Sequence, residues 1–179
     1  MYINQNLRHA FLAAVLIVSV CKTTLGATTF NLWAYGSSHG IGAAGFCQGN
    51  GIIFLCNGTS AGHLTPIYFS NTDDDTNESW TVHSNATNKP VSTLGKIALP
   101  NSNSSNTVAI VTESNSTYGV RDFFLYDSTV LAKNGGQWEN HFYALATNIS
   151  GIWKLVWDPE NLDNHNSQPV VLRNLSPEH

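Results

Sequence analysis

The segment Gly36-Ser37-Ser38-His39-Gly40 has the residue types and spacing of a catalytic serine motif. In serine hydrolases, G-x-S-x-G holds the serine on a tight turn between a strand and a helix. An apolar alternation precedes the segment here, but Ile41–Phe46 carries two glycines and is a poor helix. We therefore interpret residues 36–40 as a loop and keep a hydrolase using Ser38 as an alternative. The partners of Ser38 would come from Asp122 or Asp127 and from His141 or His165.

Carboxylates suggest two other kinds of chemistry. Asp73–Glu78 could offer oxygen ligands to calcium, but Glu78 and Ser84 stand where a calcium-binding loop needs glycine and glutamate, so a solvated acidic turn is favoured. Glycoside hydrolysis needs two carboxylates about 5–10 Å apart, and Glu113 and Glu139 are the candidates for a carboxylate-pair hydrolase. The histidines show no close metal-binding spacing, so we predict no metal and no cofactor.

Trp33 and Tyr35 are the candidate binding residues. They alternate with Leu32 and Ala34, so they would share the opposite face of the first strand. If that face meets solvent, the two rings form a stacking platform suited to sugar rings. If a second sheet covers it, they belong to the core.

Two features at and near the N-terminus predict secretion. Residues 10–20 are apolar, follow Arg8, and are too short to span a bilayer, which is typical of a cleaved signal peptide over residues 1–27. Cys47 and Cys56 remain after cleavage, and an even pair in an oxidising compartment predicts a disulfide.

The sequence also contains seven N-x-S/T acceptors for N-glycosylation. All of them fall between the apolar runs, where a glycan can stand in water. They are Asn57, Asn77, Asn85, Asn103, Asn115, Asn148 and Asn174.

Composition limits the partners. Residues 28–179 contain all 12 Asp/Glu of the sequence. They lack two of its eight Lys/Arg, because Arg8 and Lys22 belong to the predicted signal peptide. A mildly acidic chain without a basic stripe argues against a nucleic-acid or anionic-membrane partner. No second apolar stretch approaches membrane-spanning length, so we expect no membrane insertion after signal cleavage. The oligomeric state stays open.

The apolar residues recur with a period of two in runs of four to seven residues. Clusters of Asn, Ser, Gly, Asp and Pro separate these runs. The pattern predicts an all-β protein, an antiparallel β-sandwich of about ten short strands with a barrel as the alternative, in a single domain over residues 28–179. Ile152–Trp157 is apolar on both faces and is predicted to be a central strand, with Trp153 and Trp157 buried.

The two ends of the chain resemble a group of small secreted fungal glycoproteins, mostly uncharacterised. The resemblance rests on the F-x-L-x-A-x-G run Phe30–Gly36, the G-x-x-x-L-x-W run Gly151–Trp157 and the V-x-L-R run Val170–Arg173. The segment Gly45–Cys56, with its cysteine pair, departs from that group. The resemblance implies a fungal source and a secreted or surface role, and it transfers no active-site residue.

Together these observations predict a secreted, N-glycosylated, non-catalytic protein of the cell surface, wall or secretome. Its role would be binding or structural, and an extracellular carbohydrate is the favoured partner. A secreted hydrolase is the first alternative. The second is an effector-like or allergen-like protein with a protein partner.

Overall fold

The computed structural model describes residues 27–37, 41–57, 62–71, 79–86, 90–101, 106–158, 160 and 166–177. Several predictions fall on other residues. The signal peptide up to residue 26, Ser38, the acidic loop 73–78, His165, and the acceptors Asn77 and Asn103 all lie outside the described part of the chain.

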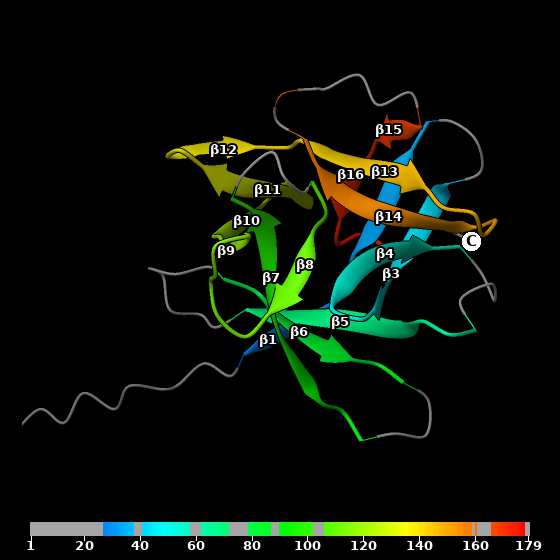
Figure 1. Cartoon of the computed structure of the whole chain (residues 1–179), viewed down its shortest axis with the longest axis horizontal. Coiled ribbons are helices and arrows are strands. Elements are labelled where there is room, and N and C mark those ends of the chain that lie inside the picture. The colour runs from blue at the N-terminus through cyan, green and yellow to red at the C-terminus, as the bar shows by residue number, and fades with distance from the viewer. Residues whose placement is uncertain are drawn as a thin grey trace, which may run out of the picture.

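The described chain is all-β, and every strand pairing is antiparallel, which confirms the predicted fold class (Figure 1). The strands are β1 (Thr28–Phe30), β2 (Trp33–Gly36), β3 (Gly42–Gly49), β4 (Ile52–Cys56), β5 (Thr65–Asn71), β6 (Thr81–Ser84), β7 (Thr93–Pro100), β8 (Ala109–Val111), β9 (Tyr118–Val120), β10 (Phe123–Tyr126), β11 (Thr129–Asn134), β12 (Gln137–Glu139), β13 (Phe142–Ala146), β14 (Ile152–Trp157), β15 (Ser167–Pro169) and β16 (Val171–Arg173).

The described residues form sixteen strands rather than about ten. The predicted first strand breaks at Asn31-Leu32, so that β1 pairs with β5 whereas β2 pairs with β3. The glycine-rich segment after residue 41, which the sequence marks as a poor helix, forms the eight-residue strand β3. Its neighbours β2, β4 and β5 supply the backbone hydrogen bonds that offset its weak intrinsic β-propensity. The short strands β12 and β15 carry too few residues for an alternation to be visible.

The hydrogen-bonded path closes on itself through β3 and β4. These two strands pair with each other, and β5, β6, β7 and β8 connect them in a second route, which makes a ring. On the other side of β3–β4 lie β2 and β16 in one direction and β14, β13 and β15 in the other. A sandwich or a barrel-like closure is compatible with this order. In Figure 1 the strands β10, β11 and β12 lie together at one side of the molecule.

One face of these strands forms the core. Along β2, β4 and β13, buried residues are flanked by partly exposed ones, and β3 follows the same pattern up to Phe46. In β14 every residue except Lys154 is buried. Trp80 lies at the centre of the aromatic part of the core, where its ring contacts Phe30, Phe69 and Phe123. The predicted central strand is confirmed as β14, with Trp153 and Trp157 buried.

The C-terminal segment Ser167–Arg173 passes from one group of strands to another. Its first half, β15, pairs with β13, and its second half, β16, pairs with β2. Pro169 lies at the change and has no N–H to extend the ladder toward β2, so pairing with β2 ends at Val171. Strands β2 and β13 therefore diverge on either side of this segment.

Candidate functional site

Three exposed aromatic rings occupy the outer surface of β10, β11 and β12. Phe123 and Leu125 point toward the core, so the alternation turns Phe124 and Tyr126 outward. Trp138 lies opposite Lys133 in the β11–β12 pair. The exposed fractions are 39% for Phe124, 68% for Tyr126 and 42% for Trp138. Large side chains with this exposure cost free energy in water unless a partner covers them.

The strand register extends this surface to the two aromatic residues predicted from sequence. Tyr126 lies opposite Thr129, Thr129 opposite Arg173, and Arg173 opposite Trp33. Directly opposed residues in antiparallel pairs point to the same side. Tyr35 is two residues from Trp33 and shares its side. We call these five rings, Phe124, Tyr126, Trp138, Trp33 and Tyr35, the aromatic face.

Trp33 and Tyr35 are half-buried, so they are neither core residues nor fully exposed ones. The Tyr35 hydroxyl donates a hydrogen bond of 2.8 Å to the Leu175 carbonyl. That bond fixes the ring of Tyr35 against the sheet and leaves its hydroxyl oxygen able to accept another hydrogen bond.

The other end of the aromatic face is held by ring and charge contacts. The rings of Phe124 and Trp138 lie 5.6 Å apart. The Lys133 ammonium lies 5.7 Å from the centre of the Trp138 ring and 3.6 Å from an Asp122 carboxylate oxygen. These contacts restrict the rotamers of Trp138, so a ligand that stacks on it meets a partly ordered surface.

A hollow adjoins the aromatic face where β2 and β13 diverge. It has a volume of about 470 Å³, within the usual range of ligand pockets. Tyr35 and Ser37 line it from the β2 side, and Asn140 and Tyr143 from the β13 side. The crossing segment Pro169–Val171 also lines it. We call this the Tyr35–Tyr143 hollow.

The polar groups that described residues contribute to this hollow are uncharged. None of its described lining residues is Asp, Glu, Lys, Arg or His. The Asn140 amide oxygen is buried and has no hydrogen-bond partner among the described residues. A buried acceptor without a partner costs free energy.

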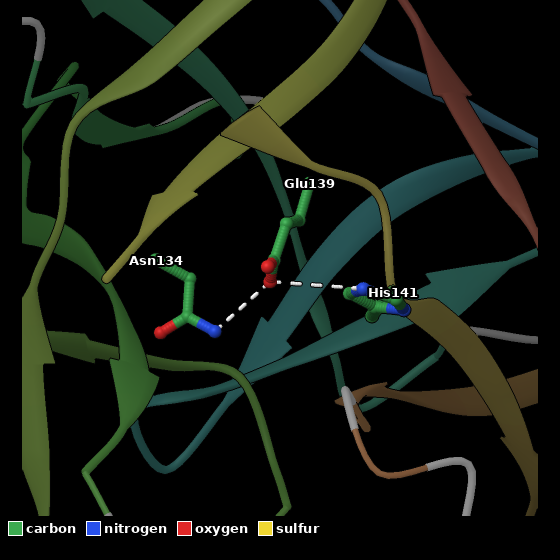
Figure 2. Close-up of polar contacts among 3 residues, drawn as sticks. All are labelled: Asn134, Glu139 and His141. Atoms are coloured by element: carbon green, nitrogen blue, oxygen red, sulfur yellow. Dashed lines mark hydrogen bonds and ion pairs between the residues drawn. The ribbon is translucent and has the colours of Figure 1, made fainter. Parts of the chain in front are cut away.

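Glu139, one of the predicted carboxylates, belongs to a separate polar cluster (Figure 2). Its Oε2 accepts a hydrogen bond of 2.9 Å from the Asn134 amide and lies 3.6 Å from the His141 Nε2. The His141 ring also packs edge-on against Trp157. The other carboxylate, Glu113, is exposed and follows β8. Strand β8 pairs with β7 and β4, whereas β12, which contains Glu139, pairs with β11. The strand pairings thus do not join the two carboxylates.

The predicted partners of Ser38 are also dispersed. Asp122 pairs with Lys133, and Asp127 lies in the turn between β10 and β11 with φ 43°. Among the described residues, no hydrogen bond or ion pair links His141 to either aspartate. Ser38 itself is outside the described residues, so the hydrolase alternative stays a prediction.

Cys47 and Cys56 form the predicted disulfide, with Cα atoms 6.2 Å apart. They lie on the adjacent strands β3 and β4, diagonal to one another on the same side, since Cys56 faces Gly45 and Cys47 faces Phe54. The disulfide therefore fastens the two strands through which the hydrogen-bonded path closes.

The five described glycan acceptors lie outside the strands. Asn57, Asn85, Asn115 and Asn148 are exposed. Asn174 is half-buried, and its side-chain oxygen is buried without a partner among the described residues.

Other kinds of site receive no support in the part of the chain that the structure covers. Its His, Cys, Asp and Glu side chains form no group of three that could hold a metal ion. That part also contains no helix with the length and apolar character needed to cross a membrane.

No protein family, curated protein or solved structure matches this chain.

Sequence reasoning proposed Trp33 and Tyr35 as binding residues, but it did not single out Phe124 and Tyr126 or join Trp138 to them. The run Phe123–Tyr126 is apolar at every position, so periodicity cannot tell which side faces water. The register with β11 provides that information.

Proposed function

We propose that this protein is a secreted, non-catalytic binding protein whose aromatic face holds an extracellular carbohydrate. One observation carries the proposal: five aromatic side chains share one side of neighbouring strands, and three of them are 39–68% exposed.

The physical reason is the match between a π-face and a sugar ring. The face of an aromatic ring carries partial negative charge, and the C–H groups on one side of a pyranose present partial positive charge and apolar surface. Several rings in a row can contact successive sugar units at once. Multiple weak contacts along one chain then add to a useful affinity through effective concentration.

The placement of the glycan acceptors supports this choice of surface. Asn57, Asn85, Asn115 and Asn148 all lie on connections outside β10, β11, β12, β16 and β2. Glycans at these four positions would not grow from the strands of the aromatic face. Asn174 follows β16 and is the half-buried exception.

The test is retention on insoluble polysaccharides, with cellulose, chitin, xylan, mannan and β-1,3-glucan as probes. We expect wild type to be retained on at least one of them. The double variant Tyr126→Ala/Trp138→Ala and the double variant Trp33→Ala/Tyr35→Ala should each lose about tenfold or more in apparent affinity, equivalent to about 1.4 kcal/mol.

Val91→Ala is the matched control, because Val91 is 65% exposed but lies between β6 and β7, away from the aromatic face. It should bind as wild type does. Wild type that no polysaccharide retains, or aromatic variants that bind unchanged, would refute the proposal and favour a protein partner. Cleavage of a glycan or ester substrate that stops in Ser38→Ala or Glu139→Gln would favour the hydrolase alternative.

A further inference from the structure

We infer that the Tyr35–Tyr143 hollow is a second subsite that takes the terminal unit of a neutral glycan chain. The inference rests on the proposed function, because the ligand class is the same. It adds that the protein recognises a chain end in addition to a flat length of polysaccharide.

The first argument is the spacing of the two tyrosines. Tyr143 lies opposite Pro169, and Tyr35 lies opposite Val171, on the two edges of the crossing segment. Two strand spacings of about 4.8 Å and two residue rises of about 3.3 Å put their Cα atoms roughly 12 Å apart. A gap of this size between two tyrosine side chains admits one sugar ring between them.

The second argument is the chemistry of the walls. The apolar residues Phe142, Val170 and Val171 are among those that line the hollow, and Ser37 and Asn140 add hydroxyl and amide groups. A sugar unit has the matching combination of an apolar ring face and several hydroxyls. Asn140 lines the hollow, and its side-chain amide is of the type that hydrogen-bonds sugar hydroxyls. With no charged side chain among the described lining residues, a carboxylated, sulfated or amino sugar would leave its charge unpaired.

The third argument is continuity with the aromatic face. Tyr35 belongs to both sites, and Val171 lines the hollow while it lies opposite Tyr35 in the sheet. From the hollow, the surface leads past Trp33 and across β16 and β11 to Tyr126. Three strand spacings separate the Cα atoms of Trp33 and Tyr126 by roughly 14 Å. A chain whose end lies in the hollow can therefore extend over the exposed rings.

The experiment separates the two sites by ligand length. Binding of neutral oligosaccharides of two to six units, prepared from the polysaccharide that retains wild type, is measured by calorimetry alongside retention on that polysaccharide. Ser37→Trp fills the hollow from an exposed position, and Asn140→Ala removes the amide of a lining residue. Thr112→Trp, at an exposed position after β8, is the matched control for an added tryptophan.

We expect Ser37→Trp and Asn140→Ala to weaken disaccharide binding at least tenfold. Thr112→Trp should bind as wild type does, and Tyr126→Ala should weaken polysaccharide retention while it changes disaccharide affinity less than twofold. Capping the chain ends by chemical modification of the disaccharide should also abolish its binding. If Ser37→Trp and Asn140→Ala bind the disaccharide as wild type does, the hollow is not a second subsite. If retention is still lost in Tyr126→Ala/Trp138→Ala, the proposed function is unaffected by that result. Wild type that binds neither probe overturns both.

Discussion

Replacing Gly95 with alanine should destabilise the fold more than any other glycine-to-alanine change in the described strands. Gly95 lies in β7 at an irregularity in the ladder, where Val82 faces Gly95 but His83 faces Thr93. One residue of β6 thus opposes two of β7, as in a β-bulge. The backbone of Gly95 has φ +143°, a value that residues with a Cβ rarely adopt.

The cost can be worked out from two contributions. A backbone conformation reserved for glycine costs about 1–3 kcal/mol in another residue. An alanine Cβ would also lie 2.5 Å from the carbonyl oxygen of Val111 and 2.9 Å from its carbonyl carbon. These atoms belong to the backbone of the paired strand β8, so the clash can be relieved only if β7 and β8 separate. We expect a total loss of about 3 kcal/mol or more, which lowers the melting temperature by about 6–12 °C for a domain of this size.

Two other glycines serve as controls in the same thermal and urea unfolding measurements. Gly135 has φ +56° with open space around it, so Gly135→Ala isolates backbone strain at about 1 kcal/mol. At Gly45 a Cβ would make an ordinary 3.9 Å contact, so Gly45→Ala should change stability by less than about 0.5 kcal/mol. If Gly95→Ala unfolds at the same temperature as Gly45→Ala, the register between β6, β7 and β8 is wrong.

Two further predictions concern covalent features of the fold. The double variant Cys47→Ala/Cys56→Ala should lose about 3 kcal/mol of unfolding free energy, the loop-entropy value for a closed loop of about ten residues. Its melting temperature should no longer respond to reductant. A variant as stable as oxidised wild type would show that the β3–β4 hydrogen bonds alone stabilise this region. Glycopeptide mass spectrometry should find low occupancy at the half-buried Asn174 and high occupancy at the exposed Asn148, and full occupancy at Asn174 would contradict the burial of its side chain.

The fold class was predictable because a strand with one buried face shows a local alternation of apolar and polar residues. Alternation with a period of two follows from the geometry of a single strand, so it is visible in segments such as Trp80–His83 or Leu94–Leu99 without knowledge of the partner strand. The cysteine pair was predictable from its even count, and the structure agrees with a disulfide.

The strand β3 was not predictable in the same way. Gly42 and Gly45 weaken any local preference, and hydrogen bonds to β2, β4 and β5 make this segment a strand. These partners are brought to β3 by the whole chain, so their effect is absent from the local sequence.

The amino-acid sequence by itself determined the all-β class, the buried central strand Ile152–Trp157 and the candidacy of Trp33 and Tyr35, because each follows from side chains within a few residues of one another. Only the tertiary structure decided that Phe124, Tyr126 and Trp138 share a side with them, and that β2 and β13 diverge around Pro169 to leave a hollow. The physical reason is that a shared face or a hollow depends on the register between strands distant in sequence, and that register is set by the packing of the entire core.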